Sequence, residues 1–556
     1  MRRHFLKIPL FICLFASCKK GGNSTPPPPT VYTIAMKSIA INVYAFDNIV
    51  YGINNQPVIK ASFTQPLERN AAGTAVSLTD ESGAVPITTS FQNGDSTLLI
   101  KPAAPLKYLT RYNFKILPSL RSASNGGFTA PVDKSFITQV DPSSKFPAIT
   151  DAALLDLVQK QTFKYFWDFG HPVSGLARER SNGDDNVVTS GGSGFGIMSI
   201  ITAISRNFIT RAEGLERLQT MTAFLKNTAQ TFKGAYPHWL NGATGVVIPF
   251  SPKDDGADLV ETSYLVQGLL CARQFFNGTS IAETGLRADI NTICNRVEWE
   301  WFRKSNENVL YWHWSPNNNW EMDHKIRGWN ECLITYVLAA ASTTHTIPAT
   351  VYTEGWAGSG TNGFINGNEY YGYTLPLGPP MGGPLFFSHY SFLGINPKGL
   401  TDPYANYATQ TKNHTLINYS YCVANPNNFF GYSDQCWGLT ASDIPNGYNA
   451  NSPTNDIGVI SPTAALSSFP YTPAESMKAL KFFYYLLGDK IWKNYGFVDA
   501  FSLKDLWFAG SFLAIDQGPI IVMIENYRSN LLWSLFTSCP EVKTGMKKLG
   551  FTAPYL

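Results

Sequence analysis

Charged residues are scarce in this chain. They make up 15% of its 556 residues, and 43 lysines and arginines stand against 40 aspartates and glutamates. Three of the basic residues, Arg2, Arg3 and Lys7, lie in an N-terminal leader that has no acidic residue, so the rest of the chain is close to neutral. No basic stripe is left to bind nucleic acid or an acidic surface. Because aromatic residues reach 14%, the composition is also unlike that of a disordered protein.

After its N-terminus the chain also lacks an apolar run of 18 residues, which is the minimum for a helix that crosses a bilayer. The best candidate, residues 520–536, is interrupted by Glu525, Asn526, Arg528 and Asn530. We therefore predict that this segment is a core helix.

Close cysteine pairs and metal-binding patterns are missing as well. The eight cysteines show no CxxC spacing, and Cys271, Cys294 and Cys332 lie in apolar helical patterns typical of buried thiols. His313 and His324 lack the HExxH spacing of a zinc helix. We expect no metal and no other cofactor. A disulfide, which an oxidising compartment would permit, stays open.

The N-terminus has the pattern of an export signal. The basic residues are followed by an apolar run at residues 8–15 and then by Ala16, Ser17 and Cys18. Small residues before a cysteine resemble a bacterial lipobox, which predicts a signal peptide at residues 1–18 and lipidation of Cys18. A plain secretory peptide is the alternative. Residues 19–31 are rich in proline and form a predicted linker, so we expect an exported protein anchored in the bacterial outer membrane, on either face.

Residues 32–141 alternate between short apolar-polar runs and turns. Predicted strands at residues 57–63, 97–100 and 112–116 are separated by turn signals such as Asn93-Gly94-Asp95. This spacing predicts a small all-β sandwich. The order of its pieces resembles the bacterial immunoglobulin-like (Ig-like) modules that often precede secreted enzymes. No plausible catalytic cluster occurs in it, so we interpret this domain as a spacer.

From residue 148 to residue 556 the period becomes helical, with two kinds of helix. Residues 215–225 and 286–301 carry a single apolar stripe, whereas residues 259–276, 332–341 and 520–536 are apolar nearly all round and must be enclosed. Alternation of one-sided and enclosed helices predicts a mainly α domain in which helical hairpins close into a ring. A solenoid is less consistent because no repeat of fixed period occurs.

Acidic residues fall at the predicted starts of the enclosed helices. Asp258 and Glu261 belong to the first, Glu331 to the second and Asp516 to the third. In a ring of hairpins the inner helices run the same way, so these carboxylates should converge at one end. Stabilisation by the helix dipole, worth about 0.3–1 kcal/mol, would also favour acids here. A general acid at such a position needs burial to raise its pKa, and Trp329 is the candidate for that burial of Glu331.

The segment at residues 310–341 is dense in aromatic rings before it becomes helical. Exposed flat rings beside an acid are typical of a site that stacks and cleaves sugars. The rings are Tyr311, Trp312, Trp314, Trp320 and Trp329.

The glycine-rich run at residues 191–196 does not indicate a nucleophile or a dinucleotide site. It lacks the GxSxG spacing of a serine elbow and follows no clear predicted strand. We predict a tight loop at the mouth of the barrel.

Six motifs in order resemble one enzyme family, the glycoside hydrolase family 144 type of bacterial β-1,2-glucanases with a glucoamylase-like domain. The resemblance covers residues 151–556. The motifs are residues 254–263, 328–331, 437–443, 461–465, 495–501 and 515–519 together with 525–527.

The resemblance implies an (α/α)6 barrel that hydrolyses linear β-1,2-glucan with inversion and without a metal. Glu331 would be the general acid, and Asp516 the base, drawing the proton of water through a substrate hydroxyl. Asp254, Asp258 and Glu261 match acidic positions of the pocket wall, for binding or for ordering water. A base that works through a hydroxyl could exceed the roughly 6.5–9.5 Å that normally separates the carboxyls of an inverting enzyme.

Further substrate contacts are predicted from residue chemistry. Aromatic faces suit the apolar side of a pyranose ring, and polar side chains suit its hydroxyls. The predicted binding residues are Trp314, Trp437 and Tyr448 for stacking, and Arg178, His324, Asn330 and Asp443 for hydrogen bonding.

Three other functions stay open at this point. A non-catalytic surface glycan-binding lipoprotein would keep the rings and tolerate loss of the acids, and a hydrolase of another β-glucan would keep both. A polysaccharide lyase would need a cluster of basic residues to bind uronic acids, and the sequence has no such cluster. Cutting within the glucan or from its end also stays open, because it depends on loops such as residues 356–373. We expect a monomer.

Overall fold

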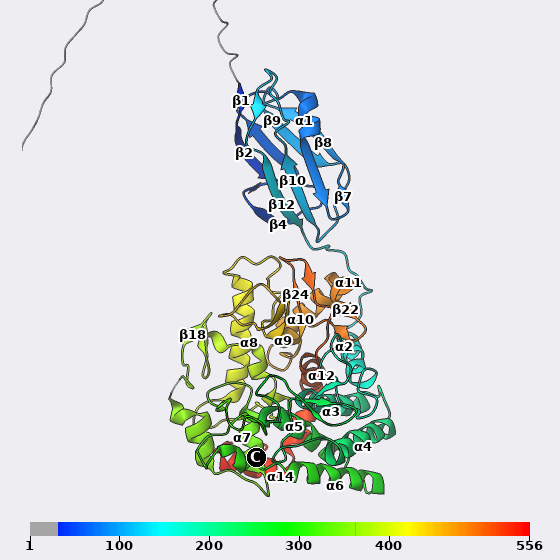
Figure 1. Ribbon diagram of the computed structural model, residues 1–556, viewed down its shortest axis with the longest axis vertical. Helices are drawn as coiled ribbons and strands as arrows, with labels where there is room; N and C mark the ends of the chain where they lie inside the picture. The colour runs from blue at the N-terminus through cyan, green and yellow to red at the C-terminus, as the bar shows by residue number, and fades with distance from the viewer. Residues whose placement is uncertain (1–31, 362) are drawn as a thin grey trace, which may run out of the picture. The chain divides into compact units, whose positions relative to one another are not determined.

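The computed structural model describes residues 32–361 and 363–556 and divides them into two compact units (Figure 1). The first contains the described residues up to Leu106 together with Arg111–Ile137, and the second contains Lys107–Thr110 with Thr138–Leu556. The predicted signal peptide (1–18) and linker (19–31) lie outside the described residues. Among the described helices, none has the length and apolar character needed to cross a membrane.

The first unit is a sandwich of two five-stranded sheets, ordered β4-β12-β10-β6-β7 and β3-β2-β5-β9-β8. Alternate residues of β5 (Ile59–Phe63) and β10 (Arg111–Ile116) point inward, which is the period expected of half-buried strands. The prediction of an Ig-like sandwich is confirmed. The other strands of the two sheets are β2 (Met36–Ile41), β3 (Tyr44–Ala45), β4 (Ile49–Ile53), β6 (Val76–Asp80), β7 (Gly83–Ala84), β8 (Ile87–Gln92), β9 (Thr97–Pro102) and β12 (Val132–Thr138), and β1 (Thr33–Ile34) pairs with β11 (Gly127–Phe128) beside them.

The second unit is an (α/α)6-type barrel, in which enclosed helices alternate along the chain with one-sided helices. Figure 1 shows α3, α5 and α12 near the middle of this unit, with α4 and α6 at its margin. The enclosed helices are α3 (Ser190–Ser205), α5 (Leu259–Phe275), α7 (Leu333–Ala341), α9 (Pro462–Leu466) and α12 (Ala514–Ser529). The one-sided helices are α2 (Asp151–Trp167), α4 (Arg211–Asn227), α6 (Ile281–Asn295), α8 (Tyr407–Ala424) and α10 (Pro473–Lys481).

The enclosed helices form a ring. Helix α3 packs against α5 and α12, α5 packs against α7, and α9 packs against α12. Between α7 and α12 the place of an inner helix is taken by a short 3-10 segment, η6 (Ser391–Leu393), which contacts both. A hydrogen bond between His389 Nε2 and Ser468 Oγ (3.0 Å) links this side of the ring to the chain after α9.

The starts of the inner helices meet at one end of the barrel, which confirms that prediction. Glu261 in the first turn of α5 accepts a hydrogen bond from Gly191 N at the start of α3 (2.9 Å). Thr463 at the start of α9 donates to the backbone oxygen of Asp516 in the first turn of α12 (2.8 Å). A side chain on Gly192 would collide with Ala514 of α12, so these two helix starts also touch.

Three local predictions were wrong. Helix α7 begins at Leu333, so Glu331 precedes the helix instead of lying in its first turn. The predicted helix at 520–536 is two helices, α12 and α13 (Leu531–Thr537), because Asn530 adopts a left-handed conformation (φ 58°) that ends α12. The glycine-rich run at 191–196 is helical and opens α3; its glycines let α3 contact its neighbours closely.

Candidate active site

Glu331 lies just before α7 in a position held by the backbone. Ser391 Oγ donates to the backbone oxygen of Glu331 and accepts from Ile334 N (3.0 Å), which ties this segment to η6. Burial raises the pKa of the Glu331 carboxyl to about 7, with added repulsion from Glu261 and Asp258. A large fraction of this carboxyl is therefore protonated at neutral pH, as a general acid requires.

Asp258 and Glu261 are buried at the start of α5 and have different roles. Asp258 caps the helix, because its Oδ1 accepts from Val260 N (3.0 Å) and Glu261 N (2.9 Å). Its Oδ2 faces His238 Nδ1 at 3.1 Å. Burial pushes the pKa of Asp258 up, but the histidine contacts outweigh it and hold the pKa below its usual value. Burial raises the pKa of Glu261.

His238 supplies positive charge beside these acids. Burial lowers its pKa, but Glu261, Asp258 and Asp254 outweigh burial and raise the pKa to about 9. The imidazole is therefore protonated at neutral pH and pairs with Asp258.

Asp254 completes this side of the site. It is 4% exposed, its Oδ2 lies 3.4 Å from His313 Nδ1, and its Oδ1 has no hydrogen-bond partner among the described residues. His238, Asp254 and Asp258 are also the described residues whose spacing could hold a metal ion. The His238 imidazolium would have to lose its proton before a metal ion could bind here, because histidine ligates metals in its neutral form.

A second acidic group surrounds Asp516 at the start of α12. Asp516 and Asp499 are each 1% exposed, and the Asp443 backbone N–H donates to Asp499 Oδ2 (2.7 Å). Arg180 joins the group through Asp443 (3.2 Å) and Glu179 (2.9 Å). Burial, together with the neighbouring charge of Asp499, raises the pKa of Asp516 well above its usual range.

Two buried tyrosines connect the acidic groups. The pKa of the Tyr390 hydroxyl is raised by burial and then by Asp516, Glu331 and Glu261, so charges from both groups act on it. The rings of Tyr390 and Tyr264 touch with their centroids 5.7 Å apart, and the Tyr264 hydroxyl is buried with no partner among the described residues. The predicted acid and base therefore both lie within electrostatic range of the Tyr390 hydroxyl.

The predicted stacking residues have three different outcomes. Tyr448 is 50% exposed and pairs with Asp443 across the hairpin of β20 (Ala441–Ile444) and β21 (Gly447–Ala450). Trp314, in β17 (His313–Trp314), is partly buried against Trp301 at 5.4 Å. The prediction for Trp437 was wrong, because its side chain is fully buried and its Nε1–H donates to a backbone oxygen. An enclosed ring offers no face to a sugar.

The predicted hydrogen-bonding residues also differ. Arg178 donates to the backbone oxygens of Asp185 (2.8 Å) and Phe169 (2.9 Å), so its guanidinium fixes a loop, and Arg180 is the arginine that reaches the acids. His324 is exposed and stacks on Trp312 with centroids 4.8 Å apart. The Asn330 side chain accepts from Cys332 N (2.9 Å) and shapes the segment that carries Glu331. Substrate contacts for these residues stay predictions.

Sequence reasoning missed several residues of the site, above all Asp499, Arg180, His238 and Tyr390. None stands at the start of an inner α-helix. Asp499 lies in the turn between β23 (Gly496–Phe497) and β24 (Phe501–Ser502), where no periodicity marks it. Its presence in one of the recognised motifs was the one available signal.

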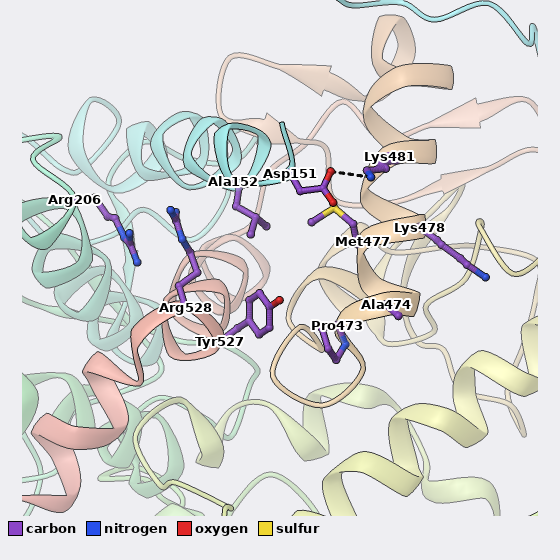
Figure 2. Close-up of a pocket in the computed structure, with 11 residues that line it drawn as sticks. Asp151, Ala152, Arg206, Pro473, Ala474, Met477, Lys478, Lys481, Tyr527 and Arg528 are labelled. Carbon is purple, nitrogen blue, oxygen red and sulfur yellow. Dashed lines mark ion pairs between the residues drawn. The ribbon is translucent and has the colours of Figure 1, made fainter. Parts of the chain in front are cut away.

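A separate cavity of about 920 Å³ lies near the C-terminal end of α12 (Figure 2). Tyr527 and Arg528 line it, eleven or more residues along the helix from Asp516, which is about 16 Å. Figure 2 shows Lys481 paired with Asp151 across it (2.7 Å). Its other cations are also paired with carboxylates: Arg206 with Glu525, Arg528 with Asp156 and Lys478 with Asp434. The cavity is therefore not part of the acid site.

Comparison with known proteins decides the family. Residues 323–540 match the family model "Putative glucoamylase", and residues 23–138 match "Bacterial Ig-like domain". An endo-β-1,2-glucanase from Chitinophaga pinensis, solved with sophorotriose and glucose, is 53% identical; the match covers 74% of this chain and all of that one, with a TM-score of 0.72. The chain belongs to the glycoside hydrolase family 144 type of β-1,2-glucanases.

Two proteins from Parabacteroides distasonis are also similar to this chain. The crystal structure of a β-1,2-glucanase is 36% identical with a TM-score of 0.71, and the match covers 94% of this chain and 74% of that one. An exo-β-1,2-glucooligosaccharide sophorohydrolase acting at the non-reducing end is 45% identical in an alignment of 437 residues that covers 75% of this chain. The chain spans only 60% of the length of that relative.

Proposed function

We propose that this protein is a glycoside hydrolase that cleaves linear β-1,2-glucan by an inverting acid-base mechanism. The observation that carries the proposal is that Glu331, whose pKa burial raises to about 7, and Asp516 both act on the buried Tyr390 hydroxyl. The relatives that act on β-1,2-glucans support the substrate. A half-exposed Tyr448 beside Asp443 supplies a ring face at the acids.

In the proposed reaction Glu331 protonates the glycosidic oxygen as the bond from that oxygen to the anomeric carbon breaks. Water attacks the opposite face of the anomeric carbon. Its proton passes through a substrate hydroxyl to Asp516, which acts as the base. The configuration inverts because one displacement occurs. Asp254, Asp258 and Glu261 bind hydroxyls or order water, and His238 balances their charge.

Substitution of the two carboxyls tests this function. Glu331→Gln and Asp516→Asn should each lower kcat by about 10²–10⁴-fold on linear β-1,2-glucan, because each removes one proton transfer. Glu354→Gln, an exposed carboxylate bonded to Asn308, is the matched control and should keep full activity. Products are measured by chromatography on β-1,2-, β-1,3- and α-1,4-glucans. Intact hydrolysis in both variants would refute the site, and a wild type that binds glucan without cleaving it would identify a glycan-binding protein.

We also propose that the protein is an exported monomer that is lipid-anchored at Cys18 in the bacterial outer membrane. The support is the sequence pattern of residues 1–18 and the linker that follows. Cys18→Ala should move the protein from the membrane fraction to the soluble fraction after cell lysis, with activity per molecule unchanged. Detergent-phase partitioning measures this, and light scattering measures the mass. Membrane association that survives in Cys18→Ala would contradict the anchor.

A further inference from the structure

Asp499 and Asp516 form a buried pair in which each side chain has an oxygen without a hydrogen-bond donor. Each residue is 1% exposed. Among the described residues, Asp499 Oδ1 and Asp516 Oδ2 have no conventional donor, although Asp499 Oδ2 accepts from Asp443 N (2.7 Å). Two buried carboxylate oxygens without a donor carry a large desolvation cost.

The start of α9 holds the two residues near each other, because Ser461 Oγ donates to the Asp499 backbone oxygen (2.9 Å) and Thr463 Oγ1 donates to the Asp516 backbone oxygen (2.8 Å). Each carboxyl also shifts the pKa of the other, which places the two side chains within interaction range. Ionised carboxylates only accept hydrogen bonds, so a bond between them requires a proton on one of them. That proton supplies the missing donor and removes one of two like charges from a buried contact.

The surroundings do not supply enough positive charge to ionise both acids. Arg180 is the cation that faces them, and it is already shared by Glu179 and Asp443. The His238 imidazolium acts on Glu179, a neighbour of the pair, but it is already paired with Asp258. The remaining titratable groups that act on the pair or its neighbours are neutral or acidic. They are Asp443, Glu179, Tyr390, Tyr448 and Tyr165.

We propose that Asp499 is a positioning residue that shares one proton with Asp516, so that the pair, and not Asp516 alone, receives the proton of the attacking water. This rests on the proposed function. Before the step the pair holds one proton and one negative charge. Water forms its bond to the anomeric carbon and releases one proton, which leaves the pair with two protons and no charge. As products leave, the pair returns one proton to solvent and Glu331 takes one up, which restores both groups.

The pH profile of Asp499→Asn tests the shared proton. The acidic limb of kcat/KM reports protonation of the pair, whereas the alkaline limb reports Glu331. In the ionisation that the acidic limb reports, the pair goes from two protons to one, and the neutral Asp499 carboxyl donates its O–H to the Asp516 carboxylate. The substituted amide donates a weaker N–H bond in its place, so Asp516 keeps its proton to higher pH. The acidic limb should shift up by about one pH unit, and the alkaline limb should stay in place. An acidic limb that stays in place, with or without loss of rate, overturns the proposal.

A matched control and a second measurement separate this result from a folding defect. Asp456 is a partly buried aspartate bonded to Tyr432 and Gly458, and Asp456→Asn should leave both limbs unmoved. Infrared spectra should show a protonated-carboxyl band at neutral pH that is weaker in Asp499→Asn and in Asp516→Asn. This band needs no substrate, and it is measured with Glu331→Gln also present, because the protonated Glu331 carboxyl would contribute to it. If the wild type is inactive and the band is present, the hydrolase is refuted and the pair is kept. Absence of the band from Glu331→Gln overturns the pair.

Discussion

At the scale of single residues, the chemistry depends on which carboxyl keeps its proton. Glu331 precedes α7 and does not lie in its first turn. The helix dipole therefore lowers the pKa of Glu331 less than it would lower that of a first-turn carboxyl. Burial and the neighbouring Glu261 and Asp258 raise the pKa of Glu331 to about 7. Asp258 lies nearby but faces His238, which holds its pKa low. The carboxyl groups of Glu331 and Asp258 thus favour opposite protonation states, although they lie near each other.

The pKa of Glu331 makes a testable prediction for Glu261. Glu261→Gln removes a negative charge that raises the pKa of Glu331, so Glu331 should lose its proton at lower pH. The alkaline limb of the kcat/KM profile, near pH 7 in the wild type, should therefore move to lower pH. Glu354→Gln, an exposed carboxylate elsewhere, should leave that limb in place. A shift of the limb to higher pH would contradict the electrostatic coupling.

At the scale of elements, the site depends on close contact between α3 and α5. A Cβ on Gly194 would lie 2.1 Å from Tyr264 O, and a Cβ on Gly268 would lie 2.2 Å from Gly194 O. The absence of these side chains lets the two helices cross backbone to backbone. This crossing places Gly191 N where it can bind Glu261.

Gly194→Ala should therefore destabilise the barrel. The added methyl group meets backbone atoms that cannot rotate away, so the free energy of unfolding should fall by roughly 3 kcal/mol. Gly285→Ala is the matched control, because this glycine lies inside α6 with no atom within 4 Å of the added Cβ. It should be neutral or stabilise by about 0.5–1 kcal/mol. Denaturant unfolding of the barrel measures both, and equal effects would refute the close-contact argument.

At the scale of the whole molecule, the two units have separate hydrophobic cores. All of the predicted catalytic and binding residues belong to the second unit. The Chitinophaga pinensis relative matches this chain over its whole length while covering 74% of it. We therefore expect the proposed chemistry not to need the Ig-like unit.

A fragment of residues 138–556 should fold and keep its activity. Its kcat/KM on soluble β-1,2-glucan should lie within about twofold of the full chain, because the fragment keeps the ring of inner helices and both acidic groups. Circular dichroism and product release measure folding and activity. The same fragment with Glu331→Gln is the inactive control. Loss of activity in a folded fragment would show that the Ig-like unit contributes to the site.

Local sequence patterns predicted much of this structure because their causes are local. Strand alternation and helical stripes reflect which face is buried, and acids at 258, 261 and 516 reflect the electrostatics of helix starts. Trp437 was different, since nothing beside it in sequence shows that its ring is enclosed. The end of α12 at Asn530 was missed because a left-handed residue leaves the apolar pattern uninterrupted.

The sequence by itself determined the two units, the alternation of enclosed and one-sided helices, and the family to which the barrel belongs. Only the tertiary structure decided that Asp499 contacts Asp516, that Arg180 and not Arg178 reaches the acids, and that His238 neutralises Asp258. These pairs are 17 to 263 positions apart in sequence. A pKa depends on burial and on charges a few ångströms away, and folding alone brings such distant residues into contact.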